Sequence, residues 1–141
     1  MLIVADTNVF LGACLGRGPS AAVVEGCLNG RFQPLMAAAL LAEYEDVLSR
    51  RTLMAKSRLN ASEREELLDI FLASCRWTRI YFGWRPNLRD EGDNHLIELA
   101  LAGGAEHIVS HNLRDLRSAE LKFPGLSAIT PAQLRKLEIA P

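Results

Sequence analysis

Short apolar runs that alternate with helical patterns are the feature that most constrains the fold of this chain. The run Leu2–Ala5 is continuously apolar, and its Ile3-Val4 pair favours a strand. A run without alternation is typical of a strand covered on both faces, as in a parallel sheet. Further strands are expected over residues 32–36, 78–82, 108–109 and 127–129. The alternation of strands and helices predicts a three-layer α/β/α fold with a central parallel sheet.

Helical patterns lie between these runs, and their ends carry capping signals. Ser20 is expected to cap a helix that Asn29-Gly30 stops, and residues 62–65 (Ser-Glu-Arg-Glu) form a capping box. Asp93 is expected to cap a helix that ends at Gly103-Gly104. The expected helices cover about residues 21–28, 40–50, 63–72 and 94–102, with a last one after the Thr-Pro pair at 130–131.

Length and composition predict a single domain over residues 1–141. Hydrophobic residues make up 49% and charged residues 23%, as in a globular protein. The net charge of −1 draws no polyanion to the whole surface, so any nucleic-acid site must be a local patch. Three cysteines without CxxC spacing favour a reducing cytoplasm and buried thiols. No signal peptide and no membrane helix are expected.

Four acidic residues fall at the ends of predicted strands or the edges of predicted helices: Asp6, Glu43, Asp93 and Asp115. Acids at strand ends are poorly placed for core packing and well placed to hold a hard divalent cation. Carboxylates held close together repel one another, and a cation relieves that repulsion. Oxygen ligands select Mg²⁺ or Mn²⁺ over Zn²⁺. The pattern therefore indicates metal-assisted hydrolysis of a phosphate ester, with water as the nucleophile.

Four motifs occur in an order that resembles the PIN-domain family. They are Asp6-Thr7-Asn8, residues 40–44 (Leu-Leu-Ala-Glu-Tyr), Asp90-x-x-Asp93-Asn94 and residues 108–116 (Ile-Val-Ser-His-Asn-Leu-Arg-Asp-Leu). The resemblance covers essentially the whole chain and is close to VapC-like toxins of bacterial toxin–antitoxin systems. It implies a Mg²⁺- or Mn²⁺-dependent endoribonuclease that cuts single-stranded RNA. It also implies a cognate antitoxin protein and a homodimer.

Each candidate metal ligand also has a simpler structural role. Asp6 fits a turn after a strand, Asp93 fits a helix N-cap, and Glu43 fits a solvated helix face. The resemblance favours metal ligation for all three, and a capping carboxylate keeps a second oxygen for a cation. By the same resemblance, Thr7 and Asn8 orient Asp6 and a metal-bound water through hydrogen bonds, with local turn chemistry as the alternative.

The last motif departs from the wider family. Many PIN domains carry Thr-Gly-Asp after this strand, where the present chain has Ser110-His111-Asn112. Ser110 keeps the hydroxyl, whereas Asn112 is neutral and can offer only an amide to a metal or its water. Asp115 is the expected replacement for the missing carboxylate, and Asp90 is a spare acid near the third motif. His111 is interpreted as a polar surface residue.

Basic and aromatic residues are candidates for holding RNA. Trp77 and Trp84 flank an apolar strand pattern and are expected in the core, with base stacking as the alternative. Six basic side chains are candidate phosphate contacts, although solvated surface charge would explain any single one. These are Arg50, Arg51, Lys56, Arg58, Arg114 and Arg117.

Competing functions differ in what the sequence offers them. A haloacid-dehalogenase-like phosphatase would need a second acid where Asn8 stands. A nucleotide-binding sheet would need a glycine-rich phosphate loop, and neither GxGxxG nor GxxxxGK[ST] occurs. A degenerate PIN domain that binds RNA or a protein without cutting is favoured only by Asn112. The hypothesis carried forward is a metal-dependent ribonuclease of a toxin–antitoxin pair, with the binding module as the alternative.

Overall fold

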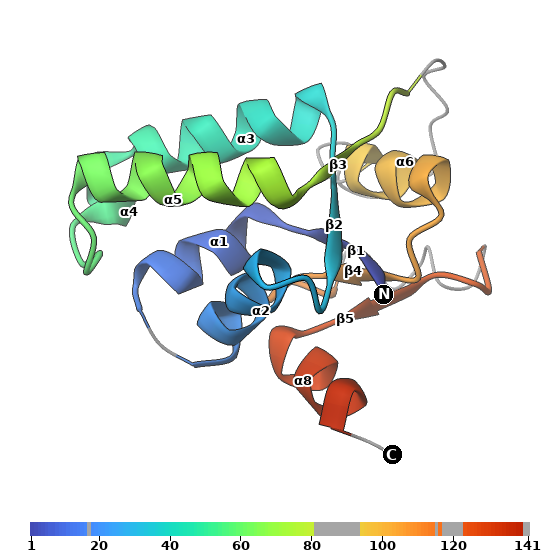
Figure 1. The fold of residues 1–141 in the computed structure, drawn as a ribbon. Coiled ribbons are helices and arrows are strands. Elements are labelled where there is room, and N and C mark those ends of the chain that lie inside the picture. The colour runs from blue at the N-terminus through green and yellow to red at the C-terminus, as the bar shows by residue number, and fades with distance from the viewer. Residues whose placement is uncertain (17, 81–93, 115, 117–122, 140–141) are drawn as a thin grey trace.

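The computed structural model describes residues 1–16, 18–80, 94–114, 116 and 123–139. Within them a five-stranded sheet has the order β3-β2-β1-β4-β5, and every neighbouring pair of strands is parallel. Figure 1 shows this sheet between two layers of helices, as the alternating sequence pattern predicted. The strands are β1 (Leu2–Ala5), β2 (Gln33–Met36), β3 (Arg76–Trp77), β4 (His107–Val109) and β5 (Ser127–Ile129).

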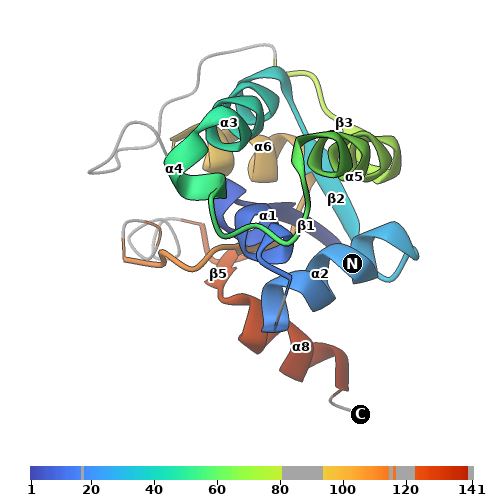
Figure 2. The same ribbon diagram turned by 90° about the vertical axis from the view of Figure 1, so that its left-hand side faces the viewer.

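Helices cover both faces of the sheet. Figures 1 and 2 show α3, α5 and α6 on one side of the strands, with α2 and α8 on the other. The described helices are α1 (Thr7–Cys14), α2 (Gly18–Leu28), α3 (Ala38–Ser49), α4 (Arg51–Met54), α5 (Ala61–Ser74), α6 (Asn94–Gly103) and α8 (Pro131–Ile139). None of them is long and apolar enough to cross a membrane.

The register of the sheet brings the carboxyl ends of the strands to one edge. Ala5 of β1 pairs with Val109 of β4, so the residues that follow them, Asp6 and Ser110, emerge side by side. Backbone bonds extend the ladder past the strand ends, because the Asp6 amide donates to the Val109 carbonyl at 2.9 Å. Ligands of parallel sheets bind at this edge, which we call the carboxyl edge.

Three aromatic rings pack against one another and connect the helices next to the carboxyl edge. Phe10 of α1, Tyr44 of α3 and Phe71 of α5 are nearly inaccessible to solvent. Their ring centroids lie 5.4 to 5.9 Å apart, within the range of favourable aromatic pairs. Since α1 begins directly after β1, this cluster fixes α3 and α5 relative to the strand that ends in Asp6.

The structure corrects several local expectations. Asn60, two residues before Ser62, is the N-cap of α5 and forms the capping box with Glu63. Ser20 lies inside α2 instead of capping it, because that helix begins at Gly18. The helices α1 and α4 were not expected at all. The strand expected over 78–82 is replaced by β3, which lies two residues earlier; residues 78–80 form no strand, and 81–82 lie outside the described part.

Candidate active site

Asp6 lies at the junction of β1 and α1, where it serves as the N-cap of the helix. Its Oδ1 accepts a hydrogen bond from the Thr7 amide at 2.7 Å, with the Thr7 hydroxyl a further 3.4 Å contact. Its Oδ2 accepts from the Ser110 hydroxyl at 2.9 Å. Only 9% of the residue is exposed. The carboxylate is therefore held in one orientation by the start of α1 and by the residue after β4, as a metal ligand requires.

The hydroxyl of Ser110 is the centre of a hydrogen-bond network. It donates its proton to Asp6 and accepts from the Asn8 side-chain amide and the Asn112 backbone amide, both at 3.0 Å. A hydroxyl has one proton and two lone pairs, so this arrangement uses its full capacity. Ser110 is completely buried, which makes each of these bonds costly to lose. Through these bonds the hydroxyl that Ser110 keeps at this position contacts Asp6 directly.

Asn8 and Asn112 both reach Asp6 through the Ser110 hydroxyl. Asn8 does not hydrogen-bond Asp6; its amide nitrogen bonds Ser110, and its Oδ1 accepts from the His111 backbone amide at 3.1 Å. These two hydrogen bonds connect the turn after β4 to the first turn of α1. Asn112 contributes its backbone amide to this network, while the residue as a whole is exposed.

His111 joins this turn to a second helix. Its Nε2 lies 2.6 Å from the Oγ of Ser20, a buried residue of α2. The close approach is possible because α1 has glycine at position 12, where a Cβ would lie 2.7 Å from the same Ser20 oxygen. His111 is exposed, as expected of a polar surface residue, and its ring also links the turn after β4 to α2.

Glu43 lies on α3 beside the first turn of α6. Its Oε1 is 2.9 Å from Nε2 of His95, although the angle is not that of a hydrogen bond. The Glu43 side chain is 42% exposed, against 17% for His95, so the carboxylate is accessible to a ligand. The simple interpretation of Glu43 as a solvated helix residue does not account for this contact.

Tyr44 anchors α3 to the strand that carries the first acid. The buried hydroxyl donates to the Ala5 carbonyl at 2.6 Å, one residue before Asp6. Burial raises the pKa of Tyr44 well above its ordinary value, so the group acts as a neutral donor. This bond holds the α3 segment that includes Glu43 against the end of β1.

The other two predicted acids, Asp93 and Asp115, lie outside the described residues, as does Asp90. Within the described part of the chain, no three His, Cys, Asp or Glu side chains gather closely enough to hold a metal ion. Asp6 and Glu43 are thus the predicted ligands that the structure describes. Both offer oxygen, the donor that Mg²⁺ and Mn²⁺ prefer.

The cysteines are not candidates for a nucleophile. Burial raises the pKa of Cys14 to about 11 and those of Cys27 and Cys75 to about 12. A thiol is nucleophilic only as the thiolate, which these values exclude near neutral pH. The predicted burial is confirmed for Cys14 and Cys27, while Cys75 is half-buried.

A groove that sequence reasoning missed continues the carboxyl edge beyond the acids. Its volume is about 720 Å³, and its described lining comprises residues 37–39, 77–80, His95 and Glu98. Trp77 is 53% exposed there, so the expectation that it lies in the core is wrong. The cause is the earlier position of β3, since a shifted strand turns its side chains to other faces. An exposed aromatic side chain next to an apolar strand gives no sequence signal that distinguishes it from core.

Taken together, a parallel α/β/α sheet, an acid at the end of its first strand, and a buried hydroxyl just after the neighbouring strand are typical of a PIN-like fold. Residues 2–114 match the PIN domain family, and the chain belongs to that family. Its fold is similar to that of a chain in the crystal structure of VapBC2 from Rickettsia felis bound to a DNA fragment from their promoter. The TM-score is 0.56 at 16% identity, over 92% of this chain and 98% of that one. No curated protein matches the chain.

Proposed function

We propose that this protein is a metal-dependent endoribonuclease that cleaves single-stranded RNA and is the toxin of a toxin–antitoxin pair. The observation that carries the proposal is the fixed carboxylate of Asp6 at the carboxyl edge, bonded to Ser110 of the neighbouring strand at 2.9 Å. An acid buried at this position contributes little to packing. Holding it in one orientation suits a site for a hard cation.

Asp6 and Glu43, with Asp93 and Asp115, are the residues that would hold Mg²⁺ or Mn²⁺. When bound, such an ion would activate water and neutralise charge on the scissile phosphate. The protein's part is orientation: Ser110 and the Thr7 amide fix the two oxygens of Asp6, and Tyr44 holds α3 beside it. No protein side chain is attacked in this scheme.

The proposed partners follow from the family and from the similar structure. VapBC2 of Rickettsia felis was crystallised as a complex of two named components, which supports a cognate antitoxin for this chain. A homodimer belongs to the same proposal because the VapC-like resemblance implies it. A cytoplasmic location belongs to it because three cysteines without CxxC spacing favour a reducing compartment. Single-stranded RNA is the substrate class that the PIN resemblance implies.

A second candidate function rests on Asn112. The position offers no carboxylate, and the contact it makes with Ser110 comes from the backbone. A PIN domain with a weakened acidic cluster could bind RNA or a protein without cutting it. This binding module differs from the nuclease in one measurable property, turnover.

The test is cleavage of a mixed single-stranded RNA pool by the purified protein with Mn²⁺, repeated with EDTA. Asp93→Asn and Asp6→Asn keep the shape of each side chain and remove its charge. We expect cleavage by the intact protein, none in EDTA, and a loss of about 1,000-fold or more in each variant, since several kcal/mol of charge stabilisation disappear.

The matched control is Asp69→Asn, which removes an acid from the surface of α5 and should leave cleavage unchanged. Cleavage that survives EDTA, or that survives both Asp6→Asn and Asp93→Asn, would contradict the metal-dependent mechanism. If the intact protein binds the pool without cutting it, the binding module becomes the better description.

A further inference from the structure

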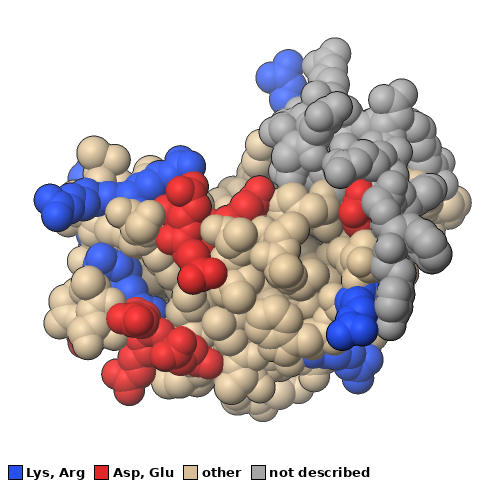
Figure 3. Space-filling model, turned by 90° about the horizontal axis from the view of Figure 1, so that it is seen from above, with Lys and Arg blue, Asp and Glu red and all other residues tan. Residues whose placement is uncertain are grey.

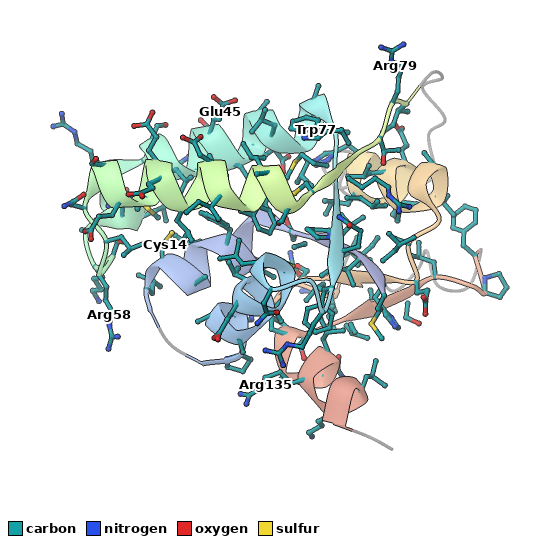
Figure 4. All side chains as sticks on the ribbon, in the orientation of Figure 1. Cys14, Glu45, Arg58, Trp77, Arg79 and Arg135 are labelled. Carbon is teal, nitrogen blue, oxygen red and sulfur yellow. The ribbon has the colours of Figure 1, made fainter. Side chains whose placement is uncertain are left out.

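Trp77 is unusually exposed for an aromatic residue in a short edge strand. Its residue is 53% exposed, although it belongs to β3, whose pairing with β2 holds its backbone in place. Figure 4 shows Trp77 on the upper side of the molecule, near the start of α3, with Arg79 extending from the same segment. A rigid backbone that displays a large flat ring is suited to stacking against another flat group.

The groove beside Trp77 leads directly to the candidate active site. Residues 37–39 follow β2, the strand between β3 and β1, so the groove and Asp6 share one edge of the sheet. At the usual strand spacing, β3 lies about 10 Å from β1. His95 belongs to both places, because it lines the groove and contacts Glu43. A strand of RNA with its phosphate at the acids could therefore reach the groove with a neighbouring base.

Some buried polar atoms at the groove make no hydrogen bond to the described residues. Oε1 of Glu98 and both ring nitrogens of His95 are buried and have no hydrogen-bond partner among the described residues. A buried acceptor without a donor costs free energy until a ligand supplies one. Glu98 therefore favours a ligand that brings an N–H group into the groove.

We propose that this groove is a nucleobase subsite in which Trp77 stacks on a base of single-stranded RNA and Glu98 accepts a hydrogen bond from its amino group. The inference rests on the proposed ribonuclease function. The groove has a volume of about 720 Å³, which lies within the range of small-ligand sites, roughly 300 to 1,000 Å³. Cytosine and adenine present an amino donor where uracil presents the O4 acceptor, so the subsite selects cytosine or adenine over uracil.

The charge of the surface favours this groove over the neighbouring helical face as the path of RNA. A second cavity of about 360 Å³ lies between α3 and α5, where Glu45, Glu65 and Asp69 line it. Figure 3 shows acidic side chains gathered on that face, which would repel phosphates. In the groove, Arg79 adds positive charge near Trp77. The candidate phosphate contact Arg58 lies at the far end of the α3–α5 pair.

The experiment measures binding of fluorescein-labelled C-rich, A-rich and U-rich RNA oligomers in EDTA, where metal-dependent cutting cannot interfere. Trp77→Ala should weaken binding by about 5- to 100-fold, and Trp77→Phe by much less, because stacking needs only a ring. Glu98→Gln should narrow the preference for C- and A-rich over U-rich oligomers. In a Trp84→Phe background, where Trp77 is the remaining tryptophan, bound RNA should quench its fluorescence.

Ile70→Ala is the matched control, since it removes a 49% exposed apolar side chain from α5. Thermal unfolding of each variant shows whether the fold is intact. Equal RNA affinity of Trp77→Ala and Ile70→Ala overturns the nucleobase subsite. If Trp77→Ala then still cleaves RNA with an unchanged KM, the proposed ribonuclease function stands without the subsite. If Trp77→Ala no longer binds a protein partner but binds RNA with unchanged affinity, the nucleobase subsite is also overturned. If the intact protein neither binds nor cuts RNA, that result contradicts both the ribonuclease function and the nucleobase subsite.

Discussion

The β1–β4 end and the β3 end of the carboxyl edge differ in how their polar groups are satisfied. At the first end, Ser110 uses its whole hydrogen-bonding capacity on Asp6, Asn8 and Asn112. At the second end, Glu98 and His95 keep buried atoms without partners among the described residues, and Trp77 is half exposed. Among the described residues, the polar groups of the first end are satisfied by one another, whereas those of the second end would be satisfied by the proposed RNA base.

This difference separates two tasks that one edge of a sheet can perform. A group that takes part in chemistry needs one fixed orientation, which a saturated network provides. A surface that accepts a flexible strand needs contacts that remain available until the strand arrives. Substitutions at the first end should therefore cost folding stability together with activity, and those at the second end should cost binding alone.

Ser110→Ala should have the largest effect on stability and so gives the strongest test of the comparison. It removes a donor to a carboxylate and leaves two amides without their acceptor, at a position that is itself fully buried. We expect a loss of about 2 to 4 kcal/mol in the free energy of unfolding, measured by urea denaturation. Cleavage should also fall by about 10- to 100-fold, because Asp6 loses its support.

Ser49→Ala is the control for this substitution, since its exposed hydroxyl bonds only the Asp46 carbonyl within α3. It should change the free energy of unfolding by less than about 0.5 kcal/mol. Similar losses of unfolding free energy in Ser110→Ala and Ser49→Ala would show that the buried hydrogen bonds stabilise the fold no more than an exposed one.

Gly12→Ala should break the contact between α1 and α2 that supports His111. The new Cβ would lie 2.7 Å from Oγ and 2.8 Å from Cβ of Ser20, and the latter cannot move without its backbone. Overpacking of this kind costs about 1 to 3 kcal/mol. Gly125→Ala meets no atom within 4 Å and should be neutral. Thermal unfolding distinguishes the pair, and equal melting temperatures would be inconsistent with a tight α1–α2 contact.

Tyr44→Phe should have an intermediate effect. It removes the buried hydroxyl bond to the Ala5 carbonyl while keeping the ring that packs against Phe10 and Phe71. We expect about 1 to 2 kcal/mol of destabilisation, together with a reduction in cleavage below about tenfold. An unchanged unfolding curve would mean that the aromatic cluster alone positions α3.

Trp77→Ala should have the smallest effect on stability, within about 0.5 kcal/mol, because the exposed side chain loses little packing. Its effect on RNA binding is the larger one, as described above. Differential scanning calorimetry beside Ser110→Ala provides the comparison. A destabilisation of Trp77→Ala as large as that of Ser110→Ala would show that the two ends are not built differently.

The sequence predicts the parallel sheet and the position of Asp6 well, because both depend on local patterns. An apolar run followed by an acid identifies β1 and its end, and Gly104 with φ of 73° ends α6 where the double glycine indicated. The role of Asp6 as N-cap of α1 was also available, since aspartate is a favoured capping residue. The capping box of α5 was misplaced because Asn60-x-x-Glu63 satisfies the same rule as the serine two residues later.

The groove could not be predicted, because its form depends on pairing between distant segments. Leu35 pairs with Arg76 and Met36 with Trp77, and this register decides which side chain faces solvent. The contact of His111 with Ser20 spans 91 residues and needs a glycine on a third element to permit it. Such contacts arise from packing, for which spacing in the sequence carries no signal.

The bond between Asp6 and Ser110 joins residues separated by 104 positions in the chain. During synthesis the first strand leaves the ribosome long before β4 exists, since translation proceeds from the N-terminus at about 5 to 20 residues per second. A nascent chain therefore carries Asp6 without the hydroxyl that orients it. If the protein cuts RNA, a nascent chain cannot do so before Ser110 has been translated.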